Sequence, residues 1–114
     1  MKRGQQDTVA VIEDDSSMRK SIERLLNVYG YPVEAFASAE AFLERQQKAG
    51  YACAVLDIHL PGMSGFELTR ELTAVGRALP IIFVTAIDDD ILREEAARTG
   101  CVAYLRKPYA PELL

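Results

Sequence analysis

Five short apolar runs, separated by longer segments of helical periodicity, constrain the fold of this chain more than any other feature of its sequence. The runs are Val9–Ile12, Val33–Phe36, Cys53–Leu56, Ile81–Val84 and Val102–Leu105. They are short and rich in β-branched or aromatic residues, as β-strands are. Most of them lack the alternation of apolar and polar residues that marks a sheet with one face in water. We therefore expect a parallel sheet that is covered by helices on both faces.

The segments between these runs carry apolar residues at the three- and four-residue spacings of amphipathic helices. The faces that they form are, in chain order, Met18 with Ile22, Leu25 and Leu26, Ala41 with Phe42, Phe66 with Leu68, Leu72 and Val75, and Ile91 with Leu92, Ala96 and Ala97. Crossovers between parallel strands are almost always right-handed, so these helices are expected on both faces of the sheet. The sequence therefore predicts an α/β fold of five strand–helix repeats.

Capping residues mark the expected helix ends. The predicted N-caps are Ser16, Ser38 and Asp88, because their short polar side chains can accept hydrogen bonds from the first helical turn. Glycines that suit a left-handed C-cap follow the four helical segments, at Gly30, Gly50, Gly76 and Gly100. A fifth helix would begin near Ala110 and is cut short at Leu114. Residues 1–114 are thus expected to form one domain with an incomplete last helix.

The overall composition excludes several classes of protein. The formal net charge of −4 disfavours nucleic-acid binding by this chain alone, because phosphate contacts need clustered Lys and Arg. No apolar run approaches the ~20 residues that span a membrane, and residues 1–7 lack the apolar core of a signal peptide. Cys53 and Cys101 are interpreted as small buried residues in a reducing, cytoplasmic environment. A disulfide or a metal pair is less favoured, because no second Cys or His lies at ligand spacing.

Polar residues follow the strands at their carboxyl ends, where ligands bind in open α/β sheets. The first strand is followed by Glu13-Asp14-Asp15, the third by Asp57, the fourth by Thr85-Ala86 and the fifth by Arg106-Lys107-Pro108. If the sheet is parallel, these positions converge on one edge. The edge would then hold at least three carboxylates, one hydroxyl and one ammonium group.

Crowded carboxylates repel one another, and they raise a pKa or recruit a cation. Mg2+ (or Mn2+) suits this group, because it accepts one or two carboxylates together with waters and phosphate oxygens. The alternative is that Glu13, Asp14 and Asp15 only place negative charge at the N-terminus of the first helix. The coincidence with Asp57, Thr85 and Lys107 at the other strand ends favours the metal site.

At this point the residues resemble a known family, the receiver (CheY-like) domain of two-component response regulators. The resemblance rests on VIEDDSSMRKSI, VLDIHLPGMSGFEL, IIFVTA and YLRKPY in that order, and it covers nearly the whole chain. It implies a doubly wound, flavodoxin-like (βα)5 fold with strand order 2-1-3-4-5. The motif DIHLPGMSGFEL, at the end of the third expected strand, looks most like the FixJ/NarL-type branch, whose receivers precede a LuxR-type DNA-binding domain.

The resemblance implies that Asp57 is the phosphoacceptor, so that a buried strand aims a nucleophile into the site. Asp14 would bind Mg2+ directly, Glu13 would act through water, and the backbone carbonyl of His59 would be the third protein ligand. The family usually has aspartate where Glu13 stands. The extra methylene of Glu13 is therefore a departure that can alter metal geometry and affinity.

The remaining family positions are also filled. Thr85 matches the hydroxyl that contacts a phosphoryl oxygen, and Lys107 matches the lysine that contacts the phosphoryl group as a point charge. Lys107-Pro108 matches a cis peptide bond. Tyr104 matches the switch aromatic that turns inward when Thr85 moves toward the phosphate. The resemblance implies that this movement reshapes the surface formed by the fifth strand and its two neighbouring helices.

Several functions compete for this pattern. The first is a phosphorylatable switch, served by a sensor histidine kinase and acting as a homodimer when phosphorylated, with transcription controlled through a DNA-binding domain in a longer protein. A stand-alone receiver that acts through protein contacts is the alternative. Such a domain is not an enzyme beyond Mg2+-dependent self-phosphorylation from a phosphodonor. A phosphatase of the haloacid dehalogenase type would carry D-x-D on the first strand, where this chain has E-D-D. A degenerate receiver that only binds partners is the remaining hypothesis.

Overall fold

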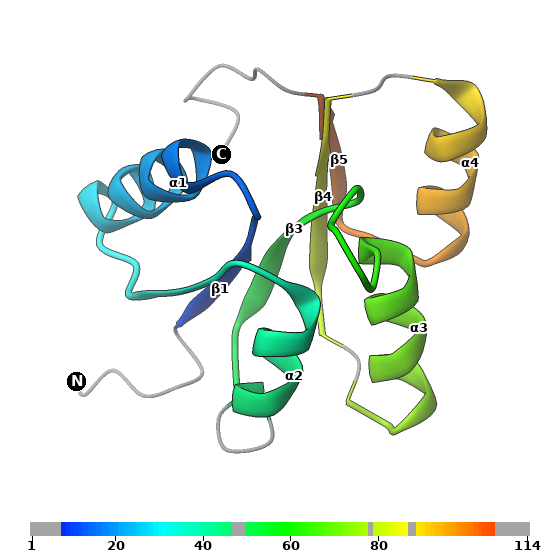
Figure 1. Ribbon diagram of the computed structural model, residues 1–114, viewed down its shortest axis with the longest axis horizontal. Helices are drawn as coiled ribbons and strands as arrows, with labels where there is room; N and C mark the ends of the chain where they lie inside the picture. Colours follow the sequence, from blue (N-terminus) through cyan, green and yellow to red (C-terminus); the bar gives the residue numbers. More distant parts are fainter. Residues whose placement is uncertain (1–7, 47–49, 78, 87–88, 107–114) are drawn as a thin grey trace.

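The computed structural model describes residues 8–46, 50–77, 79–86 and 89–106, and strands alternate with helices along them (Figure 1). The strands are β1 (Val9–Ile12), β2 (Val33–Phe36), β3 (Cys53–Asp57), β4 (Ile81–Thr85) and β5 (Ala103–Arg106). The helices are α1 (Ser16–Val28), α2 (Ala39–Gln46), α3 (Gly65–Ala74) and α4 (Asp90–Arg98). The predicted alternation of strands and helices is confirmed for this part of the chain. The fifth helix expected near Ala110 lies outside the described residues.

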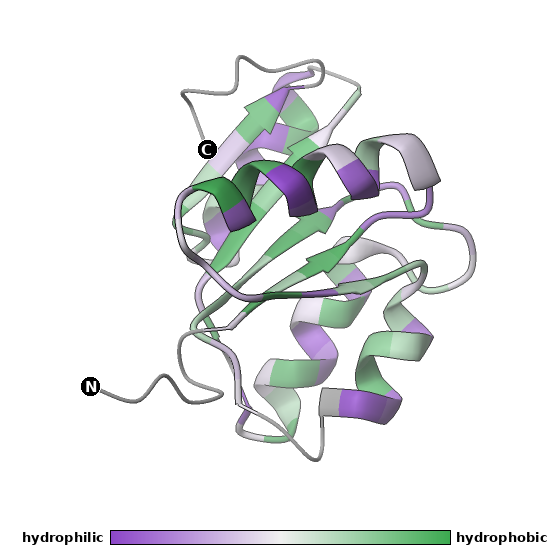
Figure 2. Ribbon diagram, turned by 90° about the vertical axis from the view of Figure 1, so that its left-hand side faces the viewer, coloured by the Kyte–Doolittle hydropathy of each residue, from purple (hydrophilic) through white to green (hydrophobic). Residues whose placement is uncertain are grey.

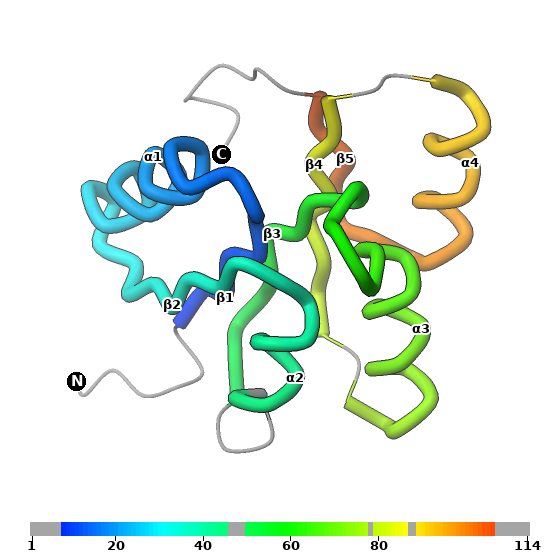
Figure 3. The backbone as a smooth tube through the Cα atoms, viewed as in Figure 1, coloured from blue at the N-terminus to red at the C-terminus, as the bar shows by residue number. Residues whose placement is uncertain are grey.

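The strands form one parallel sheet in the order β2-β1-β3-β4-β5 (Figure 3). This is the predicted order 2-1-3-4-5. Three strands differ from the expected runs by one residue, since β3 includes Asp57, β4 includes Thr85 and β5 is shifted to Ala103–Arg106. Asp57 pairs with Val84, and Thr85 pairs with Arg106. Three of the predicted site residues, Asp57, Thr85 and Tyr104, therefore belong to the sheet itself, which holds their backbones more firmly than a loop would.

Two hydrophobic clusters cover the two faces of the sheet. Because successive strand residues point to opposite faces, Ile12 and Leu56 join one cluster while Val11 and Val55 join the other. The first cluster contains residues of α2, α3 and α4, and the second contains Ile22 and Leu26 of α1. Figure 2 shows the apolar strands in the middle of the molecule, with polar residues on the helices around them. The expectation of a sheet covered on both faces is confirmed.

The helix caps differ from the prediction at two of three positions. Asp15, not Ser16, is the N-cap of α1, and its side chain accepts a hydrogen bond from the Met18 N–H. Asp89 is the N-cap of α4, whereas the predicted Asp88 lies outside the described residues. Ser38 behaves as expected, because its Oγ accepts a hydrogen bond from the Ala41 N–H at 3.1 Å. Where two capping residues are adjacent, the backbone angle at which the chain enters the helix decides which one caps it.

The cysteines are free thiols and are half-buried rather than fully buried. Burial raises the pKa of both the Cys53 and the Cys101 thiol, so both are held in the unreactive protonated form. They pack against different clusters, on opposite faces of the sheet. Within the described residues, none of the helices is both long and apolar enough to cross a membrane.

Candidate metal site at the carboxyl edge of the sheet

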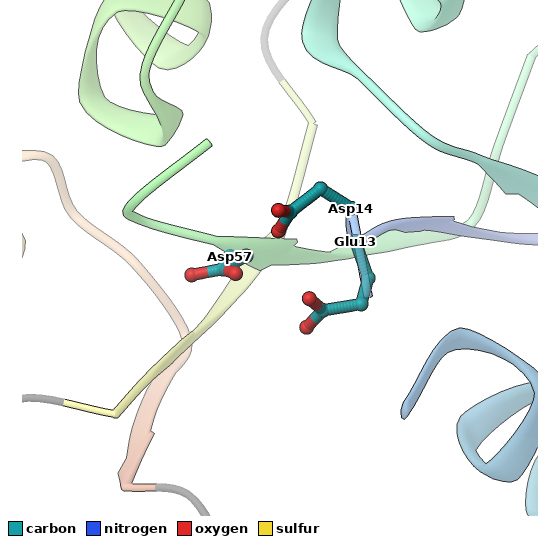
Figure 4. A group of neighbouring side chains, drawn as sticks. All are labelled: Glu13, Asp14 and Asp57. Atoms are coloured by element: carbon teal, nitrogen blue, oxygen red, sulfur yellow. The ribbon is translucent and has the colours of Figure 1, made fainter. Parts of the chain in front are cut away.

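Three carboxylates meet where β1 and β3 end. Glu13, Asp14 and Asp57 each offer an oxygen atom, and these atoms lie within 4.8 Å of one another (Figure 4). The register explains the meeting, because Ile12 of β1 is paired with Leu56 of β3, and the acids come next along the chain after each of these residues. Glu13 and Asp57 are buried, with 1% and 4% of their surface exposed, whereas Asp14 is exposed. The structure thus brings together the acids that the sequence placed at these two strand ends.

Asp57 is positioned by the sheet and by the first residues of the loop that follows it. The Ile58 N–H donates to the Val84 carbonyl at 3.1 Å, which extends the pairing of β3 and β4 past Asp57. The His59 N–H donates to Asp57 Oδ1 at 3.0 Å. A carboxylate that accepts a backbone N–H is held in a defined orientation. The structure therefore presents Asp57 as an oriented carboxylate, while the role of the His59 carbonyl as a metal ligand stays a prediction.

The loop after β1 is held by a residue that the sequence analysis did not single out. Arg19, in the first turns of α1, donates from Nη1 to the carbonyl oxygen of Glu13 at 2.8 Å and to that of Asp14 at 3.4 Å. Glu13 Oε2 in turn accepts from the Asp15 N–H at 3.1 Å. The sequence did carry a signal for this contact. Arg19 lies six residues after Glu13, on the helix that begins directly after the acidic residues. Arg19 both fixes this loop and brings positive charge to a crowded group of anions.

The loop between β3 and α3 is closed by close backbone contacts. The Gly65 N–H donates to the Ile58 carbonyl at 2.9 Å, and a Cβ on Gly65 would lie 2.5 Å from the Asp57 carbonyl oxygen. A capping box then begins α3, in which Ser64 Oγ accepts from the Glu67 N–H and Glu67 Oε1 accepts from the Ser64 N–H. The pKa of Glu67 is lowered, mainly by the hydrogen bond from the Ser64 backbone and secondly by the one from the Ser64 side chain. The turn after Asp57 is therefore tightly specified.

The predicted residues on β4 and β5 lie on the adjoining strands. Thr85 is fully buried at the end of β4, one residue beyond the partner of Asp57 in the sheet. Tyr104 is half-buried on β5, and the Arg93 guanidinium of α4 lies 5.0 Å above the centre of its ring. This distance is typical of a cation–π contact. Lys107 and Pro108, with their predicted cis peptide bond, lie outside the described residues.

The donor chemistry of the edge fits a hard divalent cation. Within the described residues the group consists of carboxylates alone, with no thiol or imidazole among the clustered ligand atoms. Mg2+ and Mn2+ prefer such oxygen donors and keep waters on their open positions, which suits a group with one exposed acid. A divalent ion would also offset the mutual repulsion of these three carboxylates.

Comparison with known proteins places this arrangement in a family. The family model for the response regulator receiver domain matches residues 9–114. FixJ, a transcriptional regulatory protein of Bradyrhizobium diazoefficiens, is 36% identical over 106 residues, which are 93% of this chain and 52% of FixJ. Nodulation protein W of the same organism is 39% identical over 106 residues, covering 93% of this chain and 47% of that protein. The chain spans about half the length of the curated relatives that it matches.

Solved structures agree with the fold described above. The structure of FixJ-N has a TM-score of 0.86 and 32% sequence identity, and the match covers 99% of this chain and 88% of that one. The response regulator StyR has a TM-score of 0.83 and 40% identity, with 93% of this chain and 54% of StyR covered. The Vibrio cholerae chemotaxis protein CheY4 has a TM-score of 0.85 and 28% identity, with 92% and 89% covered. The resemblance read from the motifs is confirmed, and this chain belongs to the response regulator receiver domain family.

Proposed function

We propose that this domain is a phosphorylation switch in which Asp57 accepts a phosphoryl group from a sensor histidine kinase. The observation that carries the proposal is the position of Asp57. It is a buried carboxylate at the last position of a central strand, and it lies in one cluster with Glu13 and Asp14. A carboxylate held this way is an oriented nucleophile, and orientation is most of what phosphoryl transfer requires of the protein.

In the transfer, a carboxylate oxygen of Asp57 forms a bond to phosphorus while the bond from phosphorus to the kinase's histidine nitrogen breaks. The electron pair of that bond returns to the nitrogen. The sheet pairing through Ile58 and the bond from the His59 N–H hold the carboxylate during the reaction. The product adds a charge of about −1.5 to −2 at the edge of the sheet. The site must therefore supply positive charge, which the three acids cannot.

Asp14 and Asp57 would hold the cation, Mg2+ or Mn2+, directly, with Glu13 acting through water and the His59 carbonyl completing the protein ligands. The bound ion supplies the positive charge that offsets the phosphoryl oxygens. Thr85, buried on the strand next to Asp57, would donate its hydroxyl to one of those oxygens. Lys107 would add a second positive charge beside the phosphoryl group.

The proposed output is a change of surface on α4 and β5. When Thr85 moves toward the phosphoryl group, Tyr104 turns inward into the space that Thr85 leaves. Arg93 lies above the Tyr104 ring, so a movement of the ring also changes the place of an α4 side chain. A surface that alters in this way suits homodimerisation as the response. Thr85 and Tyr104 would thus have two arrangements, and the charge of the phosphoryl group would favour one of them.

The full-length protein is proposed to act in the cytoplasm as a transcriptional regulator. Three matched relatives carry the name transcriptional regulatory protein, and the chain covers 48%, 52% and 47% of their lengths. A DNA-binding domain in the rest of such a protein would turn dimerisation into control of transcription. A stand-alone receiver is the alternative, and its output would be protein contacts alone. We propose no catalytic turnover of a separate substrate, only self-phosphorylation from a phosphodonor, and the receiver family match argues against the phosphatase hypothesis.

The proposal predicts one Mg2+-dependent phosphoryl adduct on Asp57. Wild type, Asp57→Asn and Asp90→Asn would each be treated with acetyl phosphate, with Mg2+ or with a chelator, and measured by intact mass. Asp90→Asn is the matched control, because it removes the same charge from the exposed first turn of α4. Wild type and Asp90→Asn are expected to gain the adduct with Mg2+ only, and Asp57→Asn is expected to gain none.

Two results would contradict this assignment. An adduct on Asp57→Asn would place the acceptor elsewhere, and an adduct in the presence of the chelator would remove the need for the metal. A wild-type chain that binds Mg2+ and still gains no adduct would support the degenerate receiver instead. In that case Glu13→Asp, which restores the residue usual in the family, is the variant to test next.

A further inference from the structure

The loop that follows Asp57 is tied to a helix distant in the sequence. Glu40, in the first turn of α2, accepts a hydrogen bond on Oε2 from the Met63 N–H at 3.0 Å, across 23 residues of chain. Of the hydrogen bonds described for residues 59–64, this is the one that reaches an element other than the strand and helix that the loop joins. Glu40 therefore controls the tip of the loop from outside it.

Gly62 shows how closely the carboxylate fits. A Cβ on Gly62 would lie 2.7 Å from Glu40 Oε2, and the φ angle of Gly62 is +75°, in the left-handed region. A side chain at this position would meet a backbone penalty, whereas the flexible end of the Glu40 side chain could move aside. The turn is thus shaped so that its backbone can approach the Glu40 carboxylate and present the next N–H to it.

Glu40 is itself on a firm support. Its neighbours on α2, Ala39 and Phe42, are fully buried in the cluster on that face of the sheet. The carboxylate is exposed, so its burial contributes little to the stability of the core. Because the first turn of α2 is fixed in the core by its buried residues, the exposed Glu40 side chain can hold the loop after Asp57 in a defined position.

Hydrogen bonds at the start and at the tip of this loop, residues 58–64, both bear on the position of the proposed metal site. At its start, His59 contacts Asp57 through its N–H, and the Gly65 N–H closes the loop onto the Ile58 carbonyl. At its tip, the Glu40 bond restrains Met63. If the hydrogen bond from Met63 to Glu40 were lost, the hydrogen bonds near Asp57 and Gly65 would still hold the loop, but its bond to α2 would be gone.

We propose that Glu40 is a positioning residue for the metal site, which sets the affinity for Mg2+ by fixing the loop that carries the His59 carbonyl. This proposal rests on the proposed function, because it takes that carbonyl as a metal ligand. Glu40 does not contact the metal or the phosphoryl group in this scheme. It acts through the backbone of residues 59–63, in the way that outer groups orient the ligands of metal sites generally.

The test is a calorimetric titration of the chain with MgCl2, on wild type and on the variants Glu40→Ala, Glu40→Gln and Glu44→Ala. Glu40→Ala removes the acceptor, and about a tenfold loss of Mg2+ affinity is expected, at the lower end of what outer-shell changes cause. Glu40→Gln keeps an oxygen acceptor without the charge and should bind Mg2+ nearly as well as wild type. Glu44→Ala removes the same charge from the next, exposed turn of α2 and should also stay near wild type.

Amide hydrogen exchange adds a measurement that does not depend on the metal. Without Mg2+, the Met63 N–H should exchange faster in Glu40→Ala than in wild type, while the amides of β3 keep their protection. Equal loss of affinity in Glu40→Ala and Glu44→Ala would show a long-range charge effect and overturn the proposal. A normal affinity in Glu40→Ala would overturn it too, and would leave the proposed function standing. A wild-type chain that does not bind Mg2+ would refute the proposed function and, with it, this inference.

Discussion

Gly65 lies where the backbone of β3 leaves no room for a side chain. A Cβ at this position would be 2.5 Å from the Asp57 carbonyl oxygen and 2.9 Å from the Ile58 Cα. Both are backbone atoms, so they cannot rotate away as the end of a side chain can. The glycine in the turn therefore does more than permit a bend. It lets α3 begin directly against the strand that carries the proposed nucleophile.

Gly65→Ala is therefore expected to lower the free energy of unfolding by about 1–3 kcal/mol, as other forced overpacking does. The backbone of Asp57 must shift to relieve the contact, so phosphorylation by acetyl phosphate should also slow. Urea unfolding measures the first effect. Gly50→Ala is the matched control, because a Cβ there meets nothing within 4 Å. Equal stability of the two variants would mean that the contact at Gly65 relaxes without cost.

At the scale of elements, one polar link joins β2, α2 and the segment before β3. Glu34 on β2 contacts the Arg45 Nε through Oε2 and accepts from the Tyr51 hydroxyl through Oε1, each at 2.7 Å. The Tyr51 ring packs at 5.5 Å from that of Phe42 and edge-on to Phe36. Tyr51 thus joins the aromatic part of the core to a surface ion pair, and this holds the edge strand against its helix.

The link predicts an acid-sensitive contribution to stability. Burial alone raises the pKa of Glu34, but the hydrogen bonds from Tyr51 and Arg45 together outweigh it and lower the pKa. A folded-state pKa below the unfolded one adds stability above the unfolded pKa, and this stability is lost as the pH falls through the folded pKa. Glu34→Gln should therefore be less stable than wild type near pH 7, and the difference should shrink as the pH falls below about 4.

Chemical denaturation of both proteins at several pH values measures this difference. The control is Glu71→Gln, which removes the same charge from an exposed position on α3. Its stability relative to wild type should change little over the same pH range. A constant difference between wild type and Glu34→Gln at all pH values would show that Glu34 contributes through packing and not through its charge.

At the scale of the whole molecule, the carboxylate cluster at the edge of the sheet is expected to lower the stability of the fold while it serves the proposed function. Glu13, Asp14 and Asp57 stand within 4.8 Å of one another, in a chain whose formal net charge is −4. Their repulsion is present in the folded state and largely absent from the unfolded one. Without a cation, this repulsion is therefore expected to work against the fold, and a divalent ion bound at the proposed site would offset it.

This conflict predicts opposite effects of one substitution in two conditions. In a chelator, Asp14→Asn should melt at a higher temperature than wild type, because it removes one of the three charges. With Mg2+ at about 100 times its dissociation constant, wild type should gain about 2.7 kcal/mol and melt on the order of 10 °C higher, whereas Asp14→Asn should gain little. Thermal melts followed by circular dichroism measure both effects. Asp90→Asn, on the exposed first turn of α4, is the control and should keep the Mg2+ response.

The described helices cover the two faces of the sheet unequally. Helices α2, α3 and α4 contribute to the cluster on one face, while α1 is the described helix on the other (Figure 1). On the α1 face, Ile82 and Leu105 are only partly buried. The pairing of these strands in a parallel sheet follows from sequence, but how fully each face is covered depends on the placement of whole helices.

The sequence by itself determined the strands, their parallel arrangement and the meeting of Asp57 with Glu13 and Asp14. These follow from local signals, since short β-branched runs form strands and the carboxyl ends of parallel strands share one edge. The roles of Lys107 and the Lys107-Pro108 bond stay predictions. The tertiary structure alone decided that Asp15 and Asp89 cap their helices, that Arg19 holds the carbonyls of the first acids, and that Glu40 holds Met63. These contacts depend on how separate elements are set against one another in space, which periodicity along the chain does not encode.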